Sequence, residues 1–214
     1  ERDFEESIEI DKINIMSFLI IDLSTQPGNL ILKIENNLFS KVLQKDNHSN
    51  DILMLEILSL FEKNKRKLDN VSKIFVNLGP GSFSGIRGSI ATSQGISLAS
   101  KIHVFGYSSF QLLRSSLHQK IKPYGFLIKI NNNHFFQPDK KVNKFGIVKK
   151  LSRDMIINIL KKNIIVSSFN YSQNTDPEIL QSTNFKLIKV NYNKLELLYN
   201  NNLLQKKFIK PLYV

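Results

Sequence analysis

The feature that most constrains the fold is an apolar strand that runs directly into a glycine-rich turn and then into a helix. Residues 73–78 have the composition of a buried strand, Gly79-Pro-Gly-Ser-Phe-Ser-Gly85 follows at once, and a helix is predicted over 84–100. Backbone N–H groups at the start of such a helix can face an anion, and glycine permits the tight turn. The segment therefore predicts a strand–turn–helix unit in an α/β fold.

The spacing of this turn departs from two familiar nucleotide-binding motifs. Its glycines follow G-x-G-x-x-x-G instead of the Rossmann G-x-G-x-x-G, and the residues after Gly85 are Ile-Arg instead of the Lys-Ser/Thr of a P-loop. A structural turn in which Ser82 or Ser84 caps the helix is favoured on spacing alone. Gly79, Gly81 and Ser82 nevertheless stay candidates for phosphate binding.

Strand and helix patterns divide the chain into an acidic extension (1–15), a first lobe (16–119) and a second, shorter lobe (120–214). A meander of strands is followed by alternating helices and strands, which predicts a mixed α/β sheet, and the second half repeats this plan in reduced form. The predicted strands are 18–23, 30–34, 38–43, 73–78, 103–107, 126–130, 135–136, 145–148, 164–168 and 186–190. The predicted helices are 51–66, 84–100, 109–117, 153–161 and 194–204.

Small residues form a stripe along the helix predicted at 84–100. Gly88, Thr92, Gly95 and Ala99 recur at intervals of four, three and four, which places them on one face. Glycine within a helix costs about 1 kcal/mol relative to alanine, so two glycines call for a compensating close approach of another backbone. That backbone belongs either to a partner or to the sheet of the same lobe, and the pattern favours neither.

The helix predicted at 51–66 is apolar around nearly its whole circumference. A surface helix normally shows one apolar face, so this pattern predicts burial on two sides, one of them against a partner protein. The predicted partner interface of the two helices consists of Ile52, Leu55, Leu58, Ser84, Arg87, Gly88, Thr92, Gly95 and Ala99.

Composition narrows the classes of function. The 214 residues carry a formal net charge of +12 and no cysteine, which excludes disulfides and thiolate metal sites. A basic chain can bind nucleic acid, but the lysines are scattered, so an AT-rich coding bias is the favoured explanation. No apolar run approaches the roughly 20 residues of a membrane helix, and the acidic start has the wrong sign for a signal peptide. We therefore expect a cytoplasmic protein without a membrane partner.

Asp22 is the strongest candidate for chemistry outside the glycine turn. It ends the first strand and is followed by Ser24, and both residues are candidates because the family resemblance given below implies that this position addresses nucleotide phosphate or its metal. The favoured alternative is an aspartate that caps a turn. The four histidines lack metal-ligand spacing, and no catalytic triad can be assembled, so no catalytic or metal-binding residue is assigned.

Several segments together resemble the TsaB family, also called YeaZ. They are Ile20-Ile-Asp-Leu-Ser-Thr25, His48 ahead of a helix, Gly79-Pro-Gly-Ser-Phe-Ser-Gly-Ile-Arg87, Gly106-Tyr-Ser-Ser109 and the closing Pro211-Leu-Tyr-Val214. The resemblance is specific over 18–118 and thin over 120–205. It implies an actin-like ATPase (ASKHA, RNase H-like) fold of two related lobes, the second one reduced.

The resemblance also implies a non-catalytic scaffold in the synthesis of threonylcarbamoyladenosine in tRNA. The implied partners are the catalytic paralogue TsaD, bound through the helices near 51–66 and 84–100, the ATPase TsaE, and tRNA through the complex, with a homodimer when the chain is alone. Ser109 and Leu113 stand where the catalytic paralogue has a metal-binding His-x-x-x-His pair, so no metal and no tightly bound ATP are expected. The alternatives are a nucleotide-binding ATPase-like enzyme and a tRNA-binding accessory module.

Overall fold

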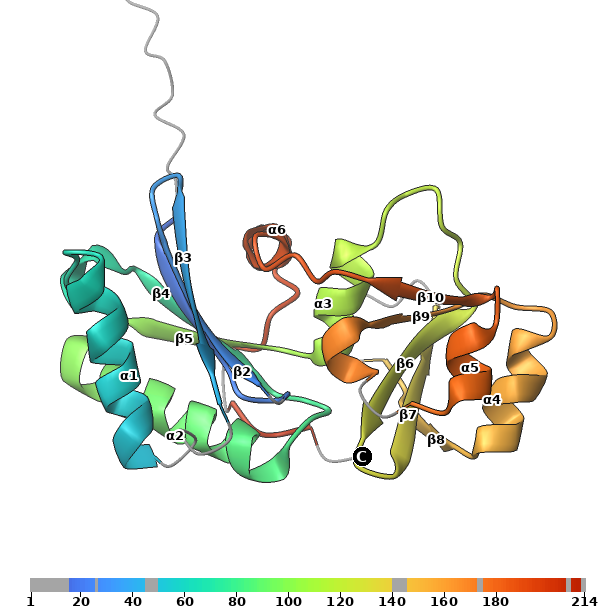
Figure 1. Ribbon diagram of the computed structural model, residues 1–214. Helices are drawn as coiled ribbons and strands as arrows, with labels where there is room; N and C mark the ends of the chain where they lie inside the picture. The colour runs from blue at the N-terminus through green and yellow to red at the C-terminus, as the bar shows by residue number, and fades with distance from the viewer. Residues whose placement is uncertain are drawn as a thin grey trace, which may run out of the picture.

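Two five-stranded mixed sheets lie side by side in the computed structural model (Figure 1). The structure describes residues 16–25, 27–44, 50–139, 146–172, 175–206 and 209–212. The acidic extension 1–15, His48, Phe145 and the final two residues lie outside this part of the chain, so the predictions made for them are not addressed by the structure.

The first sheet has the strand order β3-β2-β1-β4-β5. β1 pairs antiparallel with β2 and parallel with β4, and β4 pairs parallel with β5. The meander of the first three strands therefore lies on one side of β1, and the strands that alternate with helices lie on the other. The strands are β1 (Phe18–Asp22), β2 (Gly28–Ile34), β3 (Asn37–Leu43), β4 (Lys73–Asn77) and β5 (His103–Tyr107).

The second sheet repeats this order, and each of its strands except β6 is shorter than its counterpart. Reading β6 as the counterpart of β1, the order β8-β7-β6-β9-β10 matches that of the first sheet, with an antiparallel meander on one side and parallel pairs on the other. Two related α/β lobes, the second reduced, are thus confirmed. The strands are β6 (Gly125–Ile130), β7 (Asn133–Pro138), β8 (Lys149–Leu151), β9 (Ile165–Ser168) and β10 (Phe185–Ile188).

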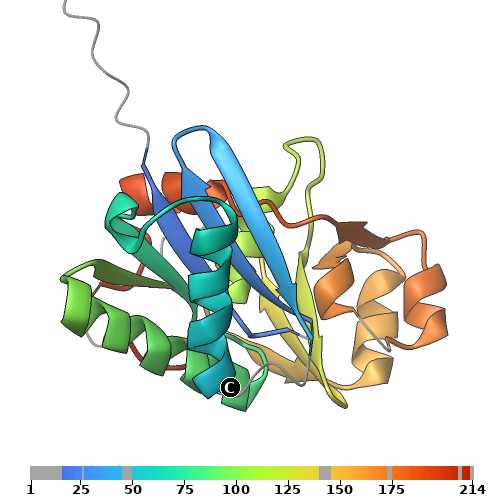
Figure 2. The same ribbon diagram turned by 60° about the vertical axis from the view of Figure 1, so that its left-hand side comes forward.

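Helices cover the sheets in three layers. α1 (Asn50–Lys63) and α2 (Phe83–Ser100) lie on the outer face of the first sheet, and α4 (Arg153–Leu160) and α5 (Pro177–Gln181) lie on the outer face of the second (Figures 1 and 2). α3 (Ser109–Ser116) and α6 (Lys194–Asn200) lie between the two sheets. Burial of apolar side chains on both faces of the first sheet explains why β1 is entirely buried.

The end of the chain returns to the first sheet. Leu195 and Leu198 of α6 pack with Phe18, on the face of the sheet opposite α1 and α2. Farther on, Gln205 forms a β-bridge with Gly106 at the edge of the sheet, and the Leu212 amide donates to the Leu78 carbonyl at 2.8 Å. Residues that follow the second sheet in sequence therefore complete the core of the first.

Three elements of the second half differ from the predictions. The strand predicted at 145–148 begins later, as β8 at Lys149–Leu151, and α6 ends at Asn200 instead of 204. Asn202 adopts φ 55°, a left-handed conformation that asparagine tolerates and that stops the helix. The short α5 is absent from the predictions, although Asp176 caps it and Pro177 occupies its first turn.

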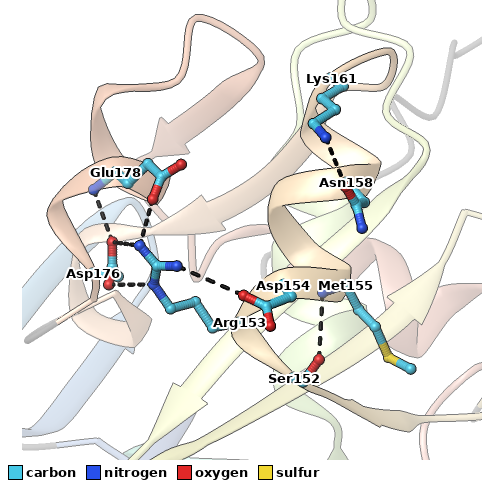
Figure 3. Close-up of polar contacts among 8 residues, drawn as sticks. All are labelled: Ser152, Arg153, Asp154, Met155, Asn158, Lys161, Asp176 and Glu178. Atoms are coloured by element: carbon cyan, nitrogen blue, oxygen red, sulfur yellow. Dashed lines mark hydrogen bonds and ion pairs between the residues drawn. The ribbon is translucent and has the colours of Figure 1, made fainter.

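An arginine joins the first turns of α4 and α5 (Figure 3). The Nε of Arg153 donates to Asp176 at 2.7 Å, and its Nη2 also pairs with Glu178. The hydrogen bond from Arg153 is the main cause that lowers the pKa of Asp176 below its ordinary value. A carboxylate with a lowered pKa stabilises the fold above its unfolded pKa, and this contribution is lost as the pH falls through the folded value.

We therefore expect Arg153→Gln to lower the melting temperature slightly at neutral pH, because this exposed pair is screened by solvent. The difference from the unaltered protein should disappear in acid, once Asp176 is protonated. Thermal unfolding followed by circular dichroism across a pH series measures it. Lys150→Gln removes an exposed positive charge from β8 and serves as the control. A difference that persists unchanged into acid would contradict the assignment.

Candidate functional site

The side chain of Asp22 lies at the centre of a buried polar cluster. Its Oδ1 accepts hydrogen bonds from the amide and hydroxyl of Ser24, at 3.0 and 2.6 Å. Its Oδ2 accepts from Asn77 Nδ2 at 3.0 Å, from the Tyr107 hydroxyl at 2.8 Å and from the Tyr192 hydroxyl at 3.1 Å. The carboxylate is fully buried, and these five donors meet the hydrogen-bonding capacity of its two oxygens.

The donors come from distant parts of the chain, so the cluster is a junction that joins the ends of two strands to the segment before α6. Asn77 ends β4, Tyr107 ends β5, and Tyr192 precedes α6, after the whole second sheet. The carboxyl ends of the parallel strands meet at one edge of the sheet, and the returning C-terminal segment adds the last donor. Asp22 was a candidate for binding nucleotide phosphate or its metal, and in the structure its carboxylate is hydrogen-bonded within the protein.

The glycine turn is likewise held by internal hydrogen bonds. The Gly79 amide donates to Asn77 Oδ1 at 2.8 Å, and the Ser82 amide donates to the Ser24 carbonyl at 2.7 Å. Ser82 is the N-cap of α2, and its hydroxyl accepts a hydrogen bond from the Gly85 amide. Ser82 is therefore the cap among the two predicted candidates, Ser82 and Ser84. A Cβ on Gly81 would lie 2.5 Å from Ser24, so Gly81 is needed for close approach of these two segments.

The three histidines in the part of the chain that the structure describes do not assemble into a site. His103 is exposed on β5, His118 is exposed in the segment between α3 and β6, and His134 is buried on β7, where burial is the main cause that lowers its pKa. Among the residues that the structure describes, no group of three or more His, Cys, Asp or Glu side chains could hold a metal ion.

Sequence reasoning found Asp22 and Ser24 but not the rest of the polar cluster. The missing members are Asn77, Tyr107, Ser109 and Tyr192. The first two could have been found, because a polar residue at the end of each neighbouring parallel strand is a local signal. Tyr192 carries no such signal, since its place depends on the return of the chain from the second sheet.

The second candidate site is an exposed surface on α1 and α2, here called the α1–α2 face. Leu55 and Leu58 of α1 are 65% and 43% exposed, and Leu98 of α2 is 87% exposed, while Ile52 is half-buried. Ser84, Arg87, Ala91, Gly95 and Ala99 are also exposed on α2. The guanidinium of Arg87 lies over the ring of Phe83, 5.1 Å from its centroid.

The stripe of small residues predicted on α2 needs a correction. Gly88 is buried within its own lobe and Thr92 is half-buried, while Gly95 and Ala99 face outward. The exposed row is rotated relative to the predicted one and runs through Arg87, Ala91 and Leu98. Ile86, Ile90 and Ser93 turn inward, and Gly88 is buried together with that row.

Alanine substitutions at two glycines of α2, Gly95 and Gly85, are expected to change the stability of the fold in opposite directions. A Cβ added to Gly95 meets no atom within 4 Å, whereas one added to Gly85 would lie 2.0 Å from the Leu23 carbonyl oxygen. We expect Gly95→Ala to stabilise the fold by up to about 1 kcal/mol through helix propensity. Gly85→Ala should destabilise it by about 1–3 kcal/mol through overpacking. Urea unfolding of both variants measures this, and equal effects would refute the packing assigned to Gly85.

Comparison with known proteins places the chain among its relatives. The family model described as "TsaD: tRNA N6-adenosine threonylcarbamoyltransferase" matches residues 42–193. The chain is 28% identical over 152 residues to the tRNA threonylcarbamoyladenosine biosynthesis protein TsaB of Buchnera aphidicola subsp. Baizongia pistaciae, covering 69% of this chain and 68% of that protein. The chain belongs to the TsaD family, on its TsaB (YeaZ) branch.

Two further matches agree with this assignment. TsaB of Buchnera aphidicola subsp. Schizaphis graminum is 33% identical over 87 residues, which is 41% of each chain. The structure of YeaZ from Pseudomonas aeruginosa superposes with a TM-score of 0.63 at 16% identity, covering 92% of this chain and all of that one. The latter likeness establishes that the two-lobed fold is shared. None of the helices in the described ranges combines the length and the hydropathy that a membrane span requires.

Proposed function

We propose that this chain is a non-catalytic scaffold in the biosynthesis of tRNA threonylcarbamoyladenosine, and that it binds a catalytic TsaD subunit through the α1–α2 face. Membership of the TsaB branch and the names of the two Buchnera relatives support the pathway. The proposal implies contact with tRNA through the assembled complex, together with TsaE, and a homodimer through the same face when TsaD is missing.

The observation that carries the scaffold role is the exposure of apolar side chains on the α1–α2 face. Leu55 and Leu98 are more than half exposed on adjacent helices, and the surface above Gly95 is open. Clustered exposed apolar side chains of this kind mark protein–protein contact sites. Small residues at 91, 95 and 99 allow a helix of a partner to approach the backbone of α2 closely.

The geometry around Asp22 supports the absence of an activity of its own. The carboxylate that would address a nucleotide is engaged by Ser24, Asn77 and two tyrosines, and the Gly79 amide is bonded to Asn77. We therefore propose that the chain needs no bound ATP or metal. Calorimetry with ATP and magnesium tests this, and binding that depends on Asp22 would favour the ATPase-like alternative instead.

Mixing the chain with its cognate TsaD and measuring mass by size-exclusion chromatography with light scattering tests the scaffold role. A single species of the summed mass at micromolar concentration is the expected result. Two separate peaks, each with the mass of one free protein, would refute the proposal.

A further inference from the structure

The end of the second sheet at which the strands β6 and β9 begin, here called the basic edge, has the features of a nucleic-acid contact. Residues 118–124 lead into β6, and residues 161–164 lead into β9. The Tyr124 amide donates to the Ile164 carbonyl at 2.7 Å, just before the parallel pairing of Gly125 with Ile165. Both segments therefore meet at the same edge of the sheet, at the upper right of Figure 1.

The charge at this edge is positive. Four lysine side chains are exposed there, namely Lys120, Lys122, Lys161 and Lys162. The Nζ of Lys161 donates to Asn158 Oδ1 at 2.9 Å, and this neutral amide leaves the lysine charge uncompensated. The edge therefore gathers four cations from two segments that are about 40 residues apart in the sequence.

The acidic side chains of the second lobe do not neutralise these lysines. The five acids after residue 120 are ion-paired with other cations: Asp139 with Arg114, Glu196 with Lys33, and Asp154, Asp176 and Glu178 with Arg153. Asp139 lies beside Tyr124, whose carbonyl accepts a hydrogen bond from the Asp139 amide at 2.9 Å, but its carboxylate is paired with Arg114. Within the described residues, none of the four edge lysines forms an ion pair. Their charge is therefore available to phosphates.

An exposed aromatic ring lies at the same edge. Tyr124 is 50% exposed, and its ring stacks on Phe136 with a centroid distance of 5.9 Å and an interplanar angle of 24°. Stacking on Phe136 holds the ring in place from one side. A nucleobase can stack on such a ring while lysines follow the phosphates, which is how sequence-tolerant single-strand binding sites are built.

We propose that this edge, formed by Lys120, Lys122, Tyr124, Lys161 and Lys162, binds a single-stranded segment of RNA through its phosphates and one stacked base. The proposal goes beyond the scaffold role and does not depend on it, because the edge lies on the second lobe and the α1–α2 face lies on the first.

The test compares two variants of the full chain with the same net charge. One replaces Lys120, Lys122, Lys161 and Lys162 by glutamine, and the control makes the same replacement at the exposed Lys65, Lys67, Lys149 and Lys150. Fluorescence anisotropy with a labelled 12-nucleotide oligouridine, across a salt series, measures affinity. Each lost phosphate contact should reduce the salt slope by about 0.7. We expect at least a tenfold loss for the edge variant and less than a threefold loss for the control.

Substitution of Tyr124 provides a second test that leaves the net charge of the chain unchanged. We expect Tyr124→Ala to weaken binding about tenfold without changing the salt slope, and Tyr124→Phe to bind normally, because stacking needs only the ring. Equal losses in the two lysine variants, preferential binding of a duplex of the same length, or no binding by the unaltered chain would each overturn the proposal. TsaD association measured on the same variants should be unchanged.

Discussion

Replacing Leu98 by aspartate is expected to abolish association with TsaD at micromolar concentration. Leu98 is the most exposed large apolar side chain of the α1–α2 face, so its substitution leaves the core of the lobe intact. In a docked complex the new carboxylate would be buried against an apolar surface without a partner. Loss of a central interface residue typically costs about 2 kcal/mol or more, which corresponds to a rise in Kd of roughly 30-fold or greater.

The matched control is Leu180→Asp, which places the same charge at an exposed leucine of α5, on the other lobe. This control should bind TsaD normally. Gly95→Leu gives an independent test, since an added Cβ at this position meets no atom within 4 Å, and a leucine side chain there would block close approach of a partner. Normal association of both Leu98→Asp and Gly95→Leu, with unchanged melting temperatures, would rule out the α1–α2 face as the docking site.

Replacing Asp22 by alanine is expected to produce the largest loss of stability. Four side chains and one backbone amide direct five hydrogen bonds at this buried carboxylate. Each buried donor left without an acceptor costs about 1–3 kcal/mol, and local rearrangement will recover part of the total. We expect a loss of about 3–5 kcal/mol, which lowers the melting temperature by roughly 10 °C in a chain of this size.

Urea unfolding measures this loss, with Asp69→Ala as the control at an exposed aspartate. If Asp22→Ala fails to fold, Tyr192→Phe provides a milder step, because it removes one donor and should cost about 1 kcal/mol. Asp22→Ala with unaltered stability would show that the cluster is not the junction described. A loss of ATP binding without a loss of stability would favour a nucleotide site.

Local sequence patterns predicted most of the elements because their signals are local. The run 103–107 has the period and composition of a strand and is one, and Ser82 precedes α2 as its cap. The predictions were weaker in the second half. β8 has three residues and α5 has five, which is too short for a hydrophobic period to be visible.

The Asp22 cluster likewise combines local contacts, which the sequence predicted, with contacts between distant residues, which it did not. The turn formed by Asp22 and Ser24 follows from three consecutive positions and was anticipated. The contribution of Tyr192 was not, because 170 residues separate it from Asp22 and only the return of the chain to the first sheet brings them together. The sequence also did not determine which face of α2 is exposed, because small residues occur on both its inner and its outer side.

The glycine segment shows what the sequence determined by itself and what only the tertiary structure decided. The sequence determined that a strand ends just before Gly79, that the chain turns tightly on glycines and that a serine starts a helix, because each of these depends on neighbouring residues. The tertiary structure decided what the turn does. Its amides are bonded to Asn77 and Ser24, and Gly81 and Gly85 lie against the segment that follows β1. Such contacts join segments that are distant in sequence, so their partners are set by packing of the whole fold.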